Sequence, residues 1–120
     1  MIDHINIGVA DLATARAFYE RALAPLGYAV LLESASGVGF GRDRKPDFWI
    51  SDRSPSAPVH VAFESPDRAT VDAFHRAALG AGGRDNGPPG LRPQYHPSYY
   101  GAFVLDAEGN NVEAVTHRPE

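Results

Sequence analysis

The chain has 120 residues, of which 43% are hydrophobic and 22% charged, values that are ordinary for one compact domain and exclude a disordered chain. The formal net charge of −4 disfavours nucleic acid or an anionic membrane as the main partner, because both are bound through basic patches. The chain has no cysteine, which excludes disulfides, thiolate metal sites and cysteine nucleophiles and leaves histidine and carboxylate as possible metal ligands.

Targeting signals are not predicted. The first residues, Met1 to His4, lack a basic stretch followed by an apolar run, and no apolar run is long enough to span a membrane. The expectation is therefore a cytoplasmic protein.

The first half of the chain is predicted to contain a strand, a helix and then three strands. Residues 2–9 are predicted to form the first strand, because apolar and polar residues alternate along it. Asp11 stands at the N-cap position of a helix with an apolar stripe, and Gly27 ends the helical segment. Three candidate strands follow: Ala29–Ser34, Gly37–Gly41 and Asp47–Ser51.

The second half repeats the first without a gap, at an offset of 56 residues. The matching pairs are His4 and His60, Asp11 and Asp67, Thr14 and Thr70, Ala17-Phe18 and Ala73-Phe74, Ala22-Leu23 and Ala78-Leu79, and Gly27 and Gly83. One register kept across a strand, a turn and a helix is typical of a duplicated supersecondary unit. His75, which stands in the place of Tyr19, is interpreted as a partly exposed helix residue and not as a ligand.

The strands of the second half complete the predicted fold. They are expected at residues 59–64, near Arg84, at Tyr99–Asp106 and at Asn111–Thr116. The predicted class is α+β: a single domain, 1–120, of two βαβββ modules that form curved antiparallel sheets around a cavity, with the helices outside. Module one spans about 1–52, a linker about 52–58, and module two about 59–117.

Three residues stand on predicted strands, on the face opposite the apolar residues: His4, His60 and Glu113. Two imidazoles and one carboxylate suit a divalent metal with open coordination positions, where it acts on substrate oxygens as a Lewis acid. The alternative is that the histidines are structural and Glu113 is solvated, and spacing alone favours it. The repeat favours a shared site, because it places both histidines at equivalent positions.

Several segments resemble proteins of the glyoxalase/bleomycin-resistance/extradiol dioxygenase superfamily, also called the vicinal oxygen chelate superfamily. The segments at residues 4–12, 17–20 and 26–28 resemble the opening of these proteins. Residues 59–63 resemble the first strand of their second module, and residues 106–113 resemble their closing turn and ligand strand. The resemblance covers nearly the whole chain, with the motifs in the family's order and spacing.

This resemblance implies that His4, His60 and Glu113 bind one divalent metal ion, for which Zn, Ni, Mn and Fe(II) all occur in the superfamily. Glyoxalase I enzymes take a fourth ligand, a carboxylate, from the last strand of the first module. Trp49 aligns with that position here, and Asp47 stands on the same face. The arrangement then resembles the three-ligand site of fosfomycin-resistance proteins or extradiol dioxygenases, and Asp47 stays open as a fourth ligand.

Residues 86–98 contain four prolines and two glycines and are predicted to form an irregular loop at the cavity mouth. Candidate catalytic residues there are His96, Tyr99 and Tyr100, as acids, bases or hydrogen-bond donors. Candidate substrate-binding residues are Arg92, through an anionic group, and Tyr95, together with Trp49. The alternative is a proline-stiffened loop whose aromatic residues pack on the sheet.

Three functions are compatible with these features. The first is a metal-dependent enzyme acting on a small oxygen-rich substrate by isomerisation, lyase chemistry, ring-opening dioxygenation or transfer to an electrophile. The second is a metal-free binding protein of the bleomycin-sequestering type, which generally lacks the ligand triad that this chain has. The third is a regulatory or immunity module, for which no specific feature is found. A homodimer is expected in any case, since small modules with sheet edges to protect often pair in this superfamily.

Overall fold

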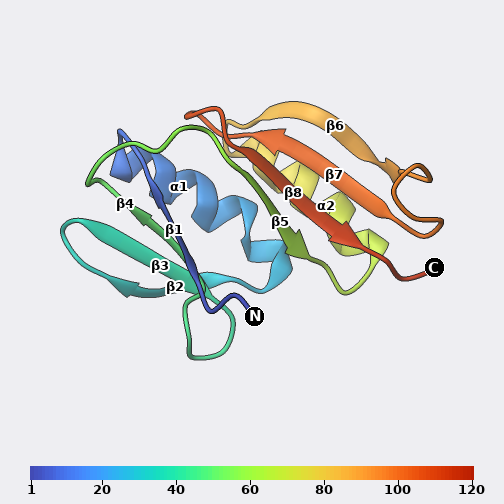
Figure 1. Ribbon diagram of the computed structural model, residues 1–120, viewed down its shortest axis with the longest axis horizontal. Helices are drawn as coiled ribbons and strands as arrows, with labels where there is room; N and C mark the ends of the chain where they lie inside the picture. Colours follow the sequence, from blue (N-terminus) through green and yellow to red (C-terminus); the bar gives the residue numbers. More distant parts are fainter.

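The computed structural model describes residues 1–120 and contains two modules of the same architecture (Figure 1). Module one contains β1 (Ile5–Gly8), α1 (Leu12–Ala22), the 3-10 helix η1 (Ala24–Leu26), β2 (Ala29–Glu33), β3 (Gly37–Gly41) and β4 (Phe48–Ser51). Module two contains β5 (His60–Glu64), α2 (Arg68–Gly80), β6 (Arg84–Leu91), β7 (Tyr100–Leu105) and β8 (Asn111–Thr116). The element order confirms the predicted α+β class and the duplicated βαβββ unit.

Each module forms one four-stranded sheet, in the order β1-β4-β3-β2 and β5-β8-β7-β6. The sheets are mixed, because β1 pairs with β4 and β5 pairs with β8 in parallel, so the expectation of purely antiparallel sheets is wrong. The reason lies in the connections: a helix crossover brings the chain back in the direction of the first strand, and the next two hairpins reverse that direction twice.

Both helices begin at the predicted N-caps. The Asp11 carboxylate accepts a hydrogen bond from the Thr14 amide at 3.0 Å, and Asp67 does the same for Thr70 at 2.8 Å. Gly27 follows η1 with a φ of 83°, as expected for a glycine that ends a helical segment. None of the helices has the length and hydropathy needed to cross a membrane.

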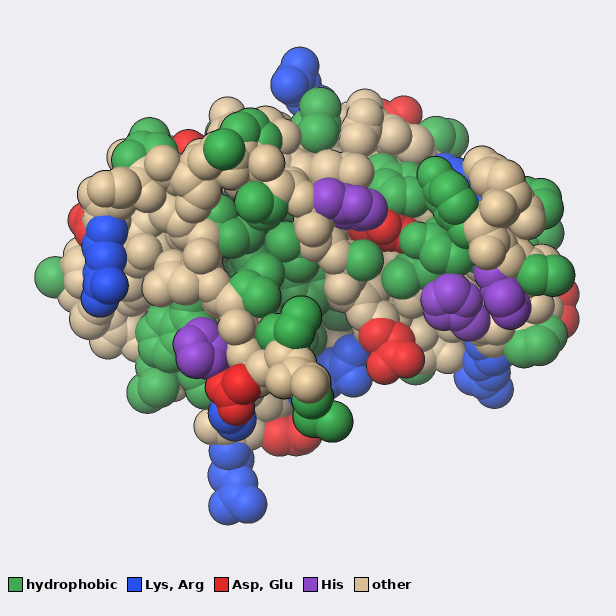
Figure 2. Space-filling model, in the orientation of Figure 1, with side chains coloured by type: hydrophobic (Ala, Val, Ile, Leu, Met, Phe, Trp, Pro, Cys, Tyr) green, Lys and Arg blue, Asp and Glu red, His purple; other side chains and the backbone are tan.

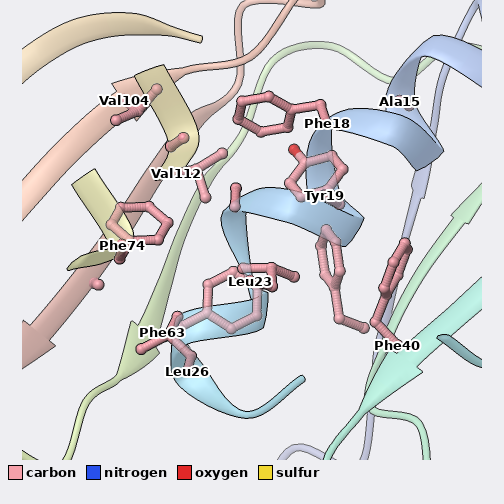
Figure 3. Close-up of a cluster of buried hydrophobic side chains, with 14 of the residues drawn as sticks. Ala15, Phe18, Tyr19, Leu23, Leu26, Phe40, Phe63, Phe74, Val104 and Val112 are labelled. Atoms are coloured by element: carbon pink, nitrogen blue, oxygen red, sulfur yellow. The ribbon is translucent and has the colours of Figure 1, made fainter. Parts of the chain in front are cut away.

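The helices pack against each other and against one side of the two sheets, so the core lies between the helix layer and the sheet layer (Figures 1 and 3). Large side chains from both modules are fully buried there, including Tyr19, Leu23, Phe40, Phe48 and Phe74. The other face of each sheet is left open, and both open faces lie on the same side of the molecule (Figure 1). A shared core thus fixes the two modules while exposing the faces opposite the helices.

Three local predictions are wrong. The prolines at 88 and 89 lie within β6, not in an irregular loop, because β6 is an edge strand and can leave donor positions unpaired. His4 precedes β1 instead of lying in it. His75 is buried, with 9% of its surface exposed, and its Nε2 lies 3.0 Å from an Asp85 oxygen. The hydrogen bond from His75 holds the pKa of Asp85 below its usual value.

A buried carboxylate, Asp106, joins the two modules. It accepts a hydrogen bond from the Tyr19 hydroxyl of α1 at 2.5 Å and one from the Asn110 side-chain amide at 2.8 Å. Its other oxygen accepts from the backbone amides of Glu108 and Asn110 at 2.9 and 2.8 Å. Asp106 is 4% exposed, and burial together with this carboxylate raises the pKa of Tyr19. A hydrogen-bonded carboxylate therefore ties the β7–β8 turn to the first helix.

Replacing Asp106 tests this connection. Asp106→Ala leaves several buried donors without an acceptor, so we expect the free energy of unfolding to fall by about 3 kcal/mol or more in urea denaturation. The control Asp52→Ala removes an exposed carboxylate from the linker and should change it by less than about 0.5 kcal/mol. Equal, small effects of both substitutions would show that the Asp106 network contributes little to stability.

Candidate functional site

The strongest concentration of polar groups on the open face of the second sheet surrounds Glu113. This residue lies in β8 opposite Ala62 of β5 and Phe103 of β7, and its side chain is only 1% exposed. His60 lies on the neighbouring strand, opposite Asn111, which puts it two residues along from Glu113 on the same face. The parallel β5–β8 pairing therefore brings the imidazole and the carboxylate together.

Both oxygens of the Glu113 carboxylate have partners. Its Oε1 lies 2.7 Å from His60 Nε2, and its Oε2 accepts a hydrogen bond from the Tyr99 hydroxyl. Burial and the bond to Glu113 raise the pKa of Tyr99, so Tyr99 stays a neutral donor. The His60 side chain is 53% exposed, and its ring lies 6.1 Å from that of Phe103. The result is a line of hydrogen bonds that leads from a buried carboxylate to an exposed imidazole.

Gly101 leaves the space that this arrangement occupies. A Cβ atom at position 101 would lie 3.2 Å from Glu113 Oε2 and 3.2 Å from Tyr99 Cε1. A side chain there would press on both partners of the Tyr99–Glu113 hydrogen bond. The glycine in β7 therefore helps to set the position of the carboxylate.

The residues predicted in the loop after β6 have separate roles. Tyr95 and His117 pack edge-on against Tyr99, with ring centroids 5.1 Å away in each case, and His96 lies 5.2 Å from His117. His96 and Tyr95 are thus exposed residues beside Tyr99. They are brought to the rim of the Glu113 region, but neither has a hydrogen bond to Glu113 or to His60.

Tyr100 is placed away from the site, and Arg92 is engaged by its own strand. Tyr100 points to the helix side, where its hydroxyl donates to Asp72 at 2.7 Å and its ring lies under the guanidinium of Arg68. The catalytic interpretation of Tyr100 is corrected accordingly, because successive residues of a strand face opposite sides of the sheet. Arg92 donates to the carbonyl oxygens of Pro88 and Gly90, both at 2.8 Å. Its guanidinium also lies 5.3 Å from the centre of the Phe103 ring, so Arg92 is on the open face beside the Glu113 region but is already bonded to β6.

His4 directly precedes β1, an edge strand of the first sheet. Its Nδ1 is 2.7 Å from an Asp3 oxygen, and the same oxygen accepts a hydrogen bond from Lys45 Nζ at 2.8 Å. These two contacts, led by that of Lys45, lower the pKa of Asp3. An Nδ1–H donated to a carboxylate leaves the imidazole Nε2 with a free lone pair, which is the form that binds metals.

The three predicted ligands do not meet within one chain. No three histidine, aspartate or glutamate side chains lie close enough to hold one metal ion. The histidines visible on the open side also do not gather at one place (Figure 2). His60 and Glu113 are suitable metal-binding groups held together, so one chain brings together two of the three predicted ligands, with His4 apart beside the first sheet.

Trp49 and Asp47 also differ in their surroundings. Trp49 lies on the open face of the first sheet, opposite Asn6 of β1 and Gly39 of β3, and is half-buried. Asp47 precedes β4 and accepts a hydrogen bond from the Tyr28 hydroxyl at 3.0 Å. Burial and this bond raise the pKa of Tyr28 to about 12. Asp47 thus has a partner other than His4.

A cavity of about 340 Å³ lies between the N-terminal residues and β5. Its walls include His60, Tyr28, Asp47 and the apolar side chains of Ile5 and Phe63. The exposed side of the His60 ring therefore borders a space large enough for a small molecule.

Sequence reasoning missed Asp3, the hydrogen-bonding partner of His4. A carboxylate next to His4 in the sequence is a signal that could have identified it.

Comparison with known proteins identifies the family. The model of the Glyoxalase/Bleomycin resistance protein/Dioxygenase superfamily matches residues 1–114. The chain therefore belongs to this superfamily, as its sequence resemblance implied. No curated protein matches the sequence.

Solved structures of similar fold carry related names. A glyoxalase/bleomycin resistance protein from Albidiferax ferrireducens T118 is 28% identical, with a TM-score of 0.82, and the match covers 95% of this chain and 97% of that one. Lactoylglutathione lyase from Agrobacterium tumefaciens is 20% identical, with a TM-score of 0.73 and coverage of 97% and 92%. A glyoxalase-related enzyme from Fulvimarina pelagi is 16% identical, with a TM-score of 0.74 and coverage of 97% and 87%. The last two likenesses show the fold alone.

The adjacent tyrosines of the loop and β7 give a matched test of the Glu113 environment. Tyr99→Phe removes a donor from a buried carboxylate, so we expect it to lower the free energy of unfolding by about 1–3 kcal/mol. Tyr100→Phe removes a donor from the more exposed Asp72, and we expect a loss below about 1 kcal/mol. Urea denaturation at neutral pH measures both. A larger effect at position 100 than at 99 would contradict the described role of Tyr99.

Proposed function

We propose that the protein is a divalent-metal-dependent enzyme that acts on a small oxygen-chelating substrate by glyoxalase-like or dioxygenase-like Lewis-acid chemistry. The observation that carries this proposal is the pair of His60 Nε2 and Glu113 Oε1, two metal-binding atoms held 2.7 Å apart, of which His60 also lines a cavity. A divalent ion bound there supplies polarisation of substrate oxygens. Zn, Ni, Mn and Fe(II) are the candidates.

The third ligand in this proposal is His4 of a second copy of the chain. Within one chain His4 lies on the first sheet, whereas the His60–Glu113 pair lies on the second, and both open faces are on one side of the molecule (Figure 1). In a two-fold dimer, the first sheet of each copy can face the second sheet of the other. Such a homodimer has two equal sites, each with two imidazoles and one carboxylate.

The residues around the ligands have defined tasks in this arrangement. Asp3 holds Nδ1 of His4 and thereby directs Nε2 outward. Tyr99 occupies one Glu113 oxygen, so the other faces His60. His96 is an exposed imidazole at the rim of this site, where it is available to exchange a proton with substrate.

A second candidate function is metal-free binding of a small molecule, as in bleomycin-resistance proteins. It is favoured by the hydrogen bonding of Glu113, whose two oxygens are both satisfied by His60 and Tyr99. The half-buried rings of Trp49 and Phe103 offer aromatic surfaces to a ligand. Metal content separates the two functions.

Metal analysis tests the proposal directly. We expect purified protein, dialysed against Zn²⁺ and then against buffer, to retain about one ion per chain, because three protein ligands make an open but specific site. His60→Ala should lose this ion, while His117→Gln, which alters an exposed histidine outside the ligand set, should retain it. Equal and negligible metal in wild type and His60→Ala would favour the sequestering function.

Mixing two inactive variants tests whether the site is shared. We expect His4→Ala and His60→Ala each to lose metal, because each removes a ligand from every site. After the two are unfolded together and refolded, half of the dimers are mixed and contain one intact site, so about a quarter of the wild-type metal content should return. Size-exclusion chromatography with light scattering measures the oligomeric state. A site formed between copies would be contradicted if the mixture elutes as dimers but regains no metal, or if the wild type is monomeric.

A further inference from the structure

The open face of the first sheet contains a hollow around His4 that differs in chemistry from the Glu113 region. We call it the His4 hollow, and its volume is about 440 Å³. It is lined by Asp3, His4, Asn6, Lys45, Pro46, Trp49 and Arg53. Trp49 is the only tryptophan of the chain, and the hollow has two cationic side chains in a protein with a net charge of −4.

The indole of Trp49 forms the floor of this hollow. A Cβ atom at Gly39, its neighbour on β3, would lie 2.8 Å from the Trp49 ring atoms Cη2 and Cζ2. The ring therefore lies against the glycine backbone and also lines the hollow. Because Trp49 remains half-buried and not covered, it offers a flat aromatic surface to a ligand.

The linker between the modules brings Arg53 to the rim. The linker crosses β1 at Gly8, where an added Cβ atom would lie 1.8 Å from the carbonyl oxygen of Ser54. Gly8 also donates its amide to the Ser56 hydroxyl at 2.8 Å and accepts from the Ser56 amide at 3.0 Å. The path of the linker is thus fixed by backbone contacts that only a glycine permits.

Two side chains in the hollow have hydrogen-bond donors without a partner, Asn6 and Arg53. Asp3 uses one carboxylate oxygen for both His4 and Lys45. Asn6 accepts a hydrogen bond from the Ser51 hydroxyl at 3.1 Å through its oxygen, which leaves its amide nitrogen free to donate. Arg53 is exposed, and the arginine and lysine ion pairs of the chain do not include it.

We infer that the His4 hollow binds the anionic, planar part of the substrate, with Arg53 pairing with a carboxylate or similar oxyanion and Trp49 stacking on the adjoining planar group. The unpaired donors of Asn6 and Arg53 can bind a ligand with acceptor oxygens. The planar guanidinium of an arginine matches a carboxylate in shape as well as charge. Asn6 donates a further hydrogen bond to the same ligand. Anion recognition thus falls to Arg53 and not to Arg92, which is held by β6.

This inference rests on the proposed function in one respect: the ligand is taken to be the substrate that the metal chelates. Binding of the anionic part itself needs no metal, so it can be measured separately. Trp49 fluorescence reports on the His4 hollow alone, since the chain has no other tryptophan.

The test uses the full-length protein with benzoate as a planar anionic probe and benzamide as its uncharged counterpart, with and without Zn²⁺. We expect benzoate to change the Trp49 emission and to bind at least fivefold more tightly than benzamide. Arg53→Gln should weaken benzoate binding by about five- to tenfold and leave benzamide unchanged. Arg53→Lys should retain part of the benzoate affinity, because it keeps the charge but not the fork.

Arg44→Gln is the matched control, because Arg44 is also exposed but lines the neighbouring polar cavity and not the His4 hollow. It should bind benzoate as the wild type does. Three results would overturn the inference. They are equal weakening of benzoate binding in both arginine variants, equal affinity of the wild type for benzoate and benzamide, and no change in wild-type emission at tens of millimolar benzoate. Arg53-dependent benzoate binding by a protein that takes up no metal would support the inference and refute the proposed function. Metal uptake by a protein whose benzoate binding does not depend on Arg53 would support the proposed function and refute the inference.

Discussion

A fully buried carboxylate needs a hydrogen-bond donor for each oxygen, and the open face of the second sheet is arranged around this requirement at Glu113. An unsatisfied charge at a position with 1% side-chain exposure would be costly, so its neighbours are constrained. Tyr99 supplies one partner and His60 the other, while Gly101 leaves the room that the hydrogen bond needs. The imidazole of His60 is thereby held beside a cavity with half of its surface exposed.

The chain presents two unlike surfaces on one side of the molecule. The shared core and the Asp106 network fix the two modules with both open faces on one side, as Figure 1 shows. One face contributes the buried carboxylate with its imidazole, and the other contributes His4 with a rim of cations and an indole. In the proposed two-fold dimer these two surfaces would face each other and complete one ligand set.

Much of the fold could be predicted from the sequence because its signals are local. The two aspartate N-caps and the alternation in β8 depend on residues close together in the chain, and the repeat from His4 to His60 shows that the same local pattern occurs twice. The parallel pairing of β1 with β4 and the inclusion of Pro88 in an edge strand depend on sheet order, which no local pattern contains.

The candidate site divides in the same way. Strand parity places His60 and Glu113 on the open face and assigns Tyr99 and Tyr100 to opposite faces, whereas the contact between His60 and Glu113 depends on the parallel pairing of β5 with β8. The separation of His4 from this pair, and the arrival of Arg53 beside Trp49, are set by the packing of modules and by the path of the linker. Both are long-range features that spacing along the chain could not give.

The most direct test of the central claim is a long-range ¹H–¹⁵N NMR spectrum of the five histidine side chains during titration with Zn²⁺. The account predicts that Nε2 of both His4 and His60 shifts together and saturates at about one ion per chain, while His75, His96 and His117 keep their shifts. A response of His60 without His4, or a response confined to His96 and His117, would contradict a metal site built from His4, His60 and Glu113.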